Sequence, residues 1–161
     1  MTETDDIDLL LTLNPHGWSS CFLFVKDNTF ELIITHSFSN PYLDLIQVLT
    51  NLIYGHNNAT LFWYGEPGGH RIEINKIMTE QHKVMVSITQ FDENFYKEQK
   101  QYSLMITFDI KLKQLITILY LQLKKTHFLL RDKQFSENRI HDFPFQEFHK
   151  FEKTAKQFLD I

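Results

Sequence analysis

Cysteine is nearly absent from this sequence of 161 residues, which contains only Cys21. A single cysteine cannot form an internal disulfide, and the disulfide frameworks of small secreted proteins need several. The first six residues carry three acidic side chains, whereas a secretory signal peptide needs a basic start followed by an apolar segment. The sequence therefore predicts a cytoplasmic protein.

Long apolar runs are also missing. The stretch from Leu115 to Leu123 is interrupted by Thr117 and Gln122. A membrane-spanning helix needs about 20 predominantly apolar residues. We therefore expect no membrane association.

Basic side chains are scarce in the first half of the chain. Residues 1–80 hold ten acidic and three basic side chains, and residues 81–161 hold ten and thirteen. General nucleic-acid binding needs a dense basic face, so we expect no nucleic-acid partner. Ordinary solvated surfaces explain the uneven charge. The alternative is an acidic surface on the N-terminal half that steers a basic partner protein.

Glycine is rare, with five residues against fifteen phenylalanines, and neither Gly nor Pro occurs between Gly69 and Pro144. That absence favours long regular elements in the second half. The phenylalanines and the hydrophobic fraction of 43% predict an aromatic-rich core. The length fits one domain spanning residues 1–161.

Alternating apolar residues predict a first antiparallel meander of three strands, at 7–13, 20–26 and 30–36. A helix follows. Asn40 is a suitable N-cap and Pro41 a suitable first residue, while Gly55 lies just beyond the expected end.

A second meander is predicted by alternating residues at 60–65, 71–75, 83–89 and 102–108. Pro67 and Gly68 suit a type II turn after its first strand. A helix capped by Asp109 comes next, although the β-branched run at 116–118 leaves a continuing strand as the alternative. A last helix begins at Pro144 with phenylalanines along one face. The predicted fold is α+β, with a mainly antiparallel sheet in the order βββ-α-βββ(β)-αα and helices packed on one face.

The turn after the fourth strand carries the densest set of candidate binding residues: Trp63, Tyr64, Glu66, His70 and Arg71. An acid, an imidazole and a guanidinium beside two amphipathic aromatics could bind a ligand or a partner protein. Turn geometry alone also explains the Pro and Gly residues, without any function.

Catalytic and metal-binding motifs are missing. The densest group of possible metal ligands is His141, Asp142, Glu147 and His149. These residues lack any recognised metal-ligand spacing, so we expect a solvated helix face and the loop that leads into it. Cys21 lies in an apolar strand, where burial raises the pKa of a thiol and makes it poorly reactive. We expect no catalytic residues, no metal and no cofactor.

Four other histidines lie at turns or strand ends, where exposed imidazoles are ordinary: His16, His36, His56 and His82.

Four features occur together in this order: a strand ending in Phe62-Trp63-Tyr64, a turn at Glu66-Pro67-Gly68, a strand starting at Arg71, and Phe143-Pro144 before the last helix. This combination resembles small uncharacterised bacterial proteins, several of which look like immunity proteins encoded beside secreted toxins. The likeness covers residues 45–158 as order and spacing. It implies a protein-binding role and supplies no catalytic residues.

The sequence thus favours a non-catalytic, immunity-like interaction module whose partner is a toxin-like or basic protein. The alternative is a small-molecule-binding protein or small enzyme with a pocket near the 63–71 turn. Homodimerisation through an open sheet edge is compatible with either function.

Overall fold

The computed structural model describes residues 2–3, 5–92 and 102–161. Its strands are β1 (Thr2–Glu3), β2 (Ile7–Asn14), β3 (Trp18–Val25), β4 (Asn28–Thr35), β5 (Asn58–Tyr64), β6 (Gly69–Lys76), β7 (Lys83–Phe91) and β8 (Tyr102–Lys111). Its helices are α1 (Pro41–Ile53), α2 (Leu112–Leu129), α3 (Lys133–Ser136), the 3₁₀ turn η1 (Ile140–Asp142) and α4 (Phe145–Leu159). The predicted α+β class and element order are confirmed.

The two predicted meanders form two separate sheets. One is the antiparallel sheet β2-β3-β4, and the other has the order β1-β8-β7-β6-β5, in which only the short β1 pairs in parallel. Alternation sets the buried face of each sheet, because successive side chains of a strand point to opposite sides. In the three-stranded sheet, for example, the buried residues Leu11, Cys21 and Leu32 are direct neighbours across the strands.

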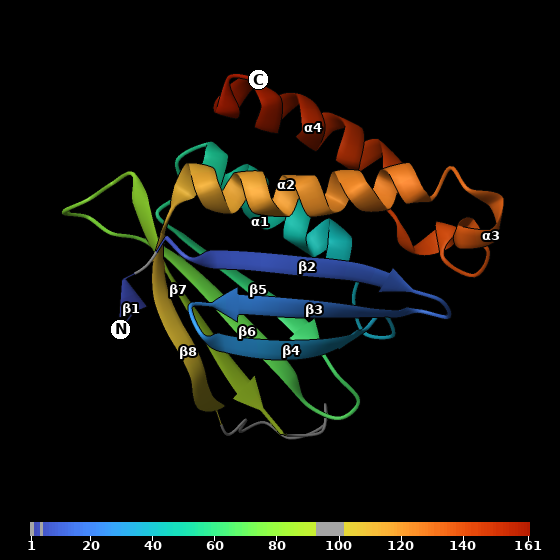
Figure 1. Cartoon of the computed structure of the whole chain (residues 1–161), viewed down its shortest axis with the longest axis horizontal. Coiled ribbons are helices and arrows are strands. Elements are labelled where there is room, and N and C mark those ends of the chain that lie inside the picture. Colours follow the sequence, from blue (N-terminus) through green and yellow to red (C-terminus); the bar gives the residue numbers. More distant parts are fainter. Residues whose placement is uncertain (1, 4, 93–101) are drawn as a thin grey trace.

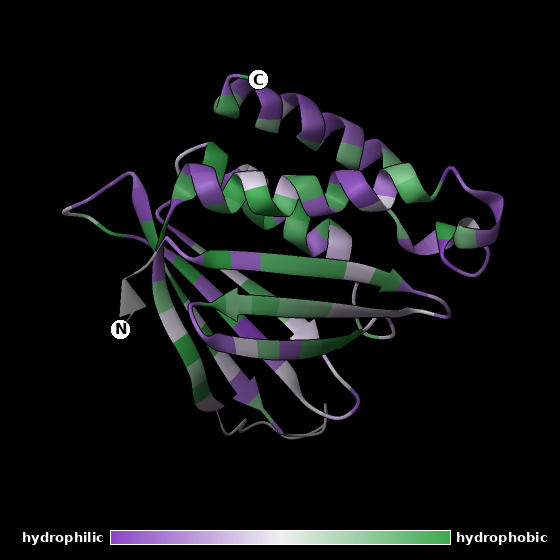
Figure 2. Ribbon diagram, viewed as in Figure 1, coloured by the Kyte–Doolittle hydropathy of each residue, from purple (hydrophilic) through white to green (hydrophobic). Residues whose placement is uncertain are grey.

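The inner faces of the two sheets share one continuous core with α1, α2 and α4. Figure 1 shows the long helices gathered on one side of the sheets. Helix α1 contacts β5, α2 contacts β2, and α4 packs on both helices. The outermost helix, α4, is mostly hydrophilic, whereas α1 is mostly hydrophobic (Figure 2).

Helix α1 begins as predicted. The side chain of Asn40 accepts a hydrogen bond from the Leu43 backbone N–H at 3.1 Å, and Pro41 is the first helical residue. Gly55 follows the helix with a φ of +95°, in the left-handed region that glycine adopts without strain. The cap, the first residue and the end of this helix are all confirmed.

The boundary between β8 and α2 differs from the prediction. Asp109 does not cap a helix, because it lies inside β8, and Lys111 occupies the N-cap position of α2. Residues 110 and 111 are strand and the β-branched run is helical. The tertiary structure outweighs the weak helix propensity there, since Leu115, Ile116 and Leu119 are buried on one face of α2.

Helix α4 contains the predicted phenylalanine stripe. Phe148 and Phe151 are fully buried, and Phe145 and Phe158 are half-buried at its two ends. Core packing therefore accounts for these side chains.

Candidate functional site

Two of the five residues singled out in the sequence point into the core. Trp63 of β5 and His70 of β6 are cross-strand neighbours, and both are buried. The Trp63 indole N–H donates to the backbone oxygen of Pro41 at 3.4 Å. Burial lowers the pKa of the His70 imidazole, and its Nδ1 has no hydrogen-bond partner among the described residues. These two side chains anchor the hairpin to the core.

Tyr64 and Arg71 lie on the opposite face of the same sheet. The Tyr64 ring packs on Phe62 at a centroid distance of 6.1 Å. The Arg71 guanidinium lies 4.1 Å from the ring centroid of Tyr102, and its Nε lies 3.3 Å from Glu73 Oε1. Arg71 is therefore already stacked and ion-paired.

Glu66 lies in the hairpin turn between β5 and β6. Its Oε1 accepts a hydrogen bond from the Thr35 hydroxyl at 2.9 Å, which ties the turn to the end of β4. The Glu66–Pro67 peptide bond is cis, and Gly68 has a φ of +78°. The five predicted residues are thus divided among the core, the outer face and a contact with the other sheet.

A groove of about 390 Å³ runs between α1 and β5, and Tyr64 is the one predicted residue that lines it. Phe38, Asp44 and Phe62 share its walls. Burial raises the pKa of the Asp44 carboxyl. The groove offers an aromatic wall and one acid.

The expectation that His36 would be exposed is wrong, because its side chain is only 6% exposed. His36 Nε2 lies 2.8 Å from Ser19 Oγ, and His36 Nδ1 lies 3.4 Å from Asp142 Oδ1. Ser19 Oγ also donates to the Tyr42 hydroxyl at 3.2 Å. His36 continues the buried alternation of Leu32 and Ile34, a signal that could have predicted its burial.

The same group has the atom order of a serine–histidine–aspartate triad, in which a base contacts both a nucleophile and an acid. Ser19, however, is completely buried, so a substrate cannot reach its Oγ. What the arrangement does is join β3, the end of β4, α1 and η1 through one polar chain. Each buried polar group thereby finds a partner, which avoids the cost of an unsatisfied donor or acceptor.

The outer face of the three-stranded sheet carries exposed apolar side chains. Leu10, Phe24 and Ile33 expose 40%, 39% and 54% of their surface, and Phe22 lies half-buried between them, opposite Leu10 and Glu31. We call Leu10, Phe22, Phe24 and Ile33 the sheet patch. Strand alternation explains it, since apolar residues also occupy positions of the outward-facing register.

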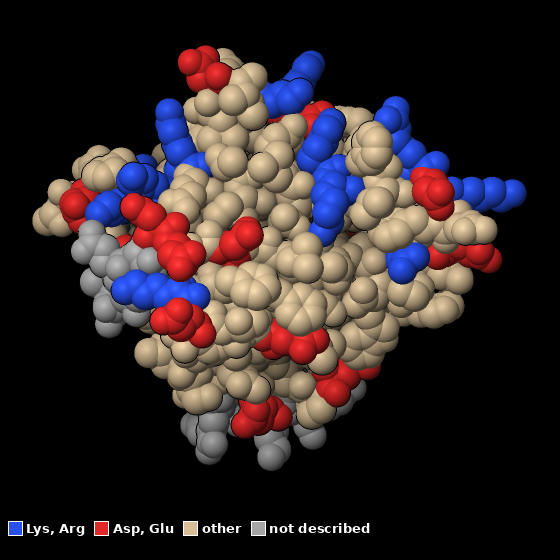
Figure 3. All heavy atoms as spheres, in the orientation of Figure 1, with Lys and Arg blue, Asp and Glu red and all other residues tan. Residues whose placement is uncertain are grey.

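Acidic side chains flank the sheet patch. Asp8 is exposed opposite Phe24, and Glu31 is exposed opposite Phe22. Residues 5–39 contain five acidic side chains and one basic side chain, Lys26. Figure 3 shows this face, with uncharged atoms at its centre, acidic groups around them, and basic groups gathered toward the helices. The sheet patch was not predicted from the sequence, although the alternative of an acidic surface concerned this half of the chain.

The possible metal ligands near η1 do not form a cluster. Asp142 faces His36, while the exposed His149 of α4 contacts the ring of His127. Within residues 2–3, 5–92 and 102–161, no three His, Cys, Asp or Glu side chains come together as a metal site. In the same residues, no helix is both long and apolar enough to cross a bilayer.

No protein-family model matches the chain, and comparisons with curated proteins and with solved structures return no match.

Proposed function

We propose that this protein is a non-catalytic interaction module, of the immunity or inhibitor type, that binds a basic partner protein through the sheet patch. The observation that supports this proposal most is the exposed apolar centre of the outer sheet face, which is flanked by the exposed acids Asp8 and Glu31. Contiguous exposed apolar patches rimmed by polar residues mark interaction sites in soluble proteins.

The sheet patch has the layout of an interface core. Phe22 and Phe24 present aromatic area on one strand, with Leu10 and Ile33 on the strands to either side. Aromatic residues are enriched at interface centres, where a few buried anchors supply most of the binding energy. Three hydrogen-bonded strands hold these side chains in fixed positions, so little conformational entropy is lost when a partner binds.

The acidic rim specifies the chemistry of the partner. Asp8 and Glu31 lie beside the apolar centre, and Asp5, Asp6 and Asp27 add charge nearby. A surface of one sign accelerates association with the opposite sign and disfavours like-charged partners. We therefore assign a partner whose docking surface is apolar at its centre and basic at its rim. An inhibitor of this kind would cover a basic active-site surface.

The test starts with affinity purification of the tagged protein from its native host, with the neighbouring genes expressed. The captured partner is identified, purified and titrated against wild type and two variants, Phe24→Ser and Ile33→Lys. Each variant should weaken binding by about tenfold or more, because each removes an anchor and Ile33→Lys adds repulsion toward a basic surface. Wild-type affinity should also fall as salt is added.

Met78→Ser is the matched control. Met78 is 63% exposed in the turn between β6 and β7, away from the sheet patch. This variant should bind like wild type. The proposal fails if no stoichiometric partner is recovered, or if the partner binds the sheet-patch variants and the control equally well.

A further inference from the structure

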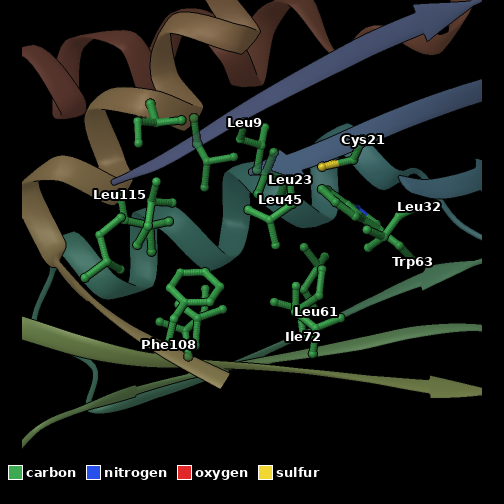
Figure 4. Close-up of a pocket in the computed structure, with 17 residues that line it drawn as sticks. Leu9, Cys21, Leu23, Leu32, Leu45, Leu61, Trp63, Ile72, Phe108 and Leu115 are labelled. Atoms are coloured by element: carbon green, nitrogen blue, oxygen red, sulfur yellow. The ribbon is translucent and has the colours of Figure 1, made fainter. Parts of the chain in front are cut away.

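An apolar cavity of about 50 Å³ lies between the two sheets and helices α1 and α2 (Figure 4). Leu45 lines it from α1, Leu115 from α2, and the remaining walls come mainly from the strands. Protein interiors contain few voids larger than a water molecule, and one water occupies about 30 Å³ in the liquid. The core therefore leaves room here for a small guest.

The lining selects against polar guests. Among the side chains that line the cavity, only those of Cys21 and Trp63 have an atom capable of hydrogen bonding, and the Trp63 N–H already donates to Pro41. Burial raises the pKa of the Cys21 thiol to about 12, so the thiol is neutral. A buried water needs two to four polar partners, which these walls do not supply, and an apolar cavity of this kind stays dry.

One wall of the cavity comes close to the surface. Of its seventeen lining residues, only Leu9 of β2 and Ile118 of α2 are partly exposed. Strand β2 and helix α2 pack against each other, so Leu9 and Ile118 mark the part of the cavity wall that lies nearest to solvent. Leu121, one helical turn after Ile118, is 51% exposed and adds an apolar surface outside.

We propose that this cavity is a binding site for a small uncharged apolar molecule, or for the last carbons of an alkyl chain, which enters between Leu9 and Ile118. The volume limits the enclosed part to a guest the size of a xenon atom or about two carbons, since a cavity of roughly 150 Å³ accommodates benzene. This site is separate from the sheet patch, and neither proposal depends on the other.

Xenon is the probe for the cavity itself. Methyl NMR spectra of the full-length protein are recorded as the xenon pressure is raised. We expect saturable shifts at Leu45, Ile72 and Val86, which line the cavity, and none at Val48, which is buried outside it. Lack of saturable shifts at the lining methyls would overturn the proposal.

A second titration separates the two sources of an apolar guest. Sodium decanoate is added to the xenon-saturated protein, below the concentration at which decanoate forms micelles. Reversal of the xenon shifts supports an alkyl-chain guest. Xenon shifts that decanoate leaves unchanged support a small-molecule guest.

Two valines on one strand provide matched variants. Val86 lines the cavity, while Val84, two residues earlier on the same buried face of β7, does not. Val86→Ile places a methylene group into the cavity and should reduce the xenon shifts by about half or more, because packed interiors have no other space for it. Val84→Ile adds the same group outside the cavity and should keep the shifts. Undiminished shifts in Val86→Ile would place the xenon elsewhere and refute the site.

Discussion

At the scale of single residues, Gly68 and Gly69 of the β5–β6 hairpin lie where a side chain has no room. A Cβ on Gly68 would collide with the backbone oxygen of Phe91, and one on Gly69 would lie 2.7 Å from the backbone oxygen of Trp63. Both residues also have positive φ angles. Close backbone packing and left-handed geometry therefore explain the glycine pair without a ligand.

Gly68→Ala should destabilise the protein more than Gly55→Ala. Gly55 also has a positive φ, but nothing lies within 4 Å of the Cβ it would gain. Gly55→Ala should therefore cost about 1 kcal/mol of unfolding free energy from backbone strain alone, and Gly68→Ala at least about 1 kcal/mol more. Urea denaturation of the two variants measures this difference. Equal losses would show that the contact with Phe91 relaxes at no cost.

At the scale of elements, the polar chain through His36 fastens η1 to the three-stranded sheet. Burial lowers the pKa of His36, and the nearby Asp142 carboxylate opposes that shift. The imidazole is consequently more easily protonated in the unfolded chain than in the folded protein. The stability that neutral His36 contributes is fully present above the pKa of about 6.5 in the unfolded chain. It is lost as the pH falls from that value through the lower pKa of the folded protein.

His36→Gln should flatten the pH dependence of stability. Wild type should lose unfolding free energy between pH 7 and pH 5, with a slope of at most about 1.4 kcal/mol per pH unit from His36. The variant should be less stable at pH 8, because it loses ring contacts, yet lose less on acidification. His70 and His127, whose pKa values burial also lowers, should retain the remaining slope.

Thermal or urea unfolding at several pH values measures this effect. The control is His56→Gln, since His56 is exposed beyond the end of α1. It should follow the wild-type profile. A His36→Gln profile parallel to wild type would show that His36 does not couple stability to pH.

At the scale of the whole molecule, both sheets and the three long helices share one buried cluster. A single sheet cannot bury its own inner face. Each sheet therefore depends on the other sheet and on the helices to cover the apolar side chains of that face. Helix α4 completes this arrangement from outside: it contacts both α1 and α2, and it buries Phe148 and Phe151.

The shared core should unfold in one cooperative transition. Tryptophan fluorescence reports on both sheets, through Trp18 of β3 and Trp63 of β5, and far-UV circular dichroism follows mainly the helices. Their urea midpoints should coincide. Phe148→Ala should lower the unfolding free energy by about 3–5 kcal/mol by both probes, and the half-buried Phe158→Ala by clearly less. Separate midpoints would show that the sheets or helices unfold independently.

The sequence was sufficient to predict much of the local structure. Residue alternation located the strands, and Asn40, Pro41 and Gly55 located α1, because periodicity and capping depend on neighbours in the chain. Burial of the Phe148 and Phe151 stripe followed from the same local pattern. At Asp109 local rules were insufficient, since pairing with β7 extends β8 past a residue that could otherwise cap a helix.

Only the tertiary structure decided which residues meet. Sequence neighbours in the 63–71 turn separate onto opposite faces of the sheet, whereas Ser19, His36 and Asp142 come together from three distant segments. The apolar cavity likewise depends on how the two sheets and the helices pack against each other. Sequence by itself determined most helices and strands, because they depend on neighbouring residues. It also determined the uneven charge of the two halves, because charge is a sum over residues. The cavity, and the choice of which sheet face stays exposed, arise from long-range packing, which no local pattern specifies.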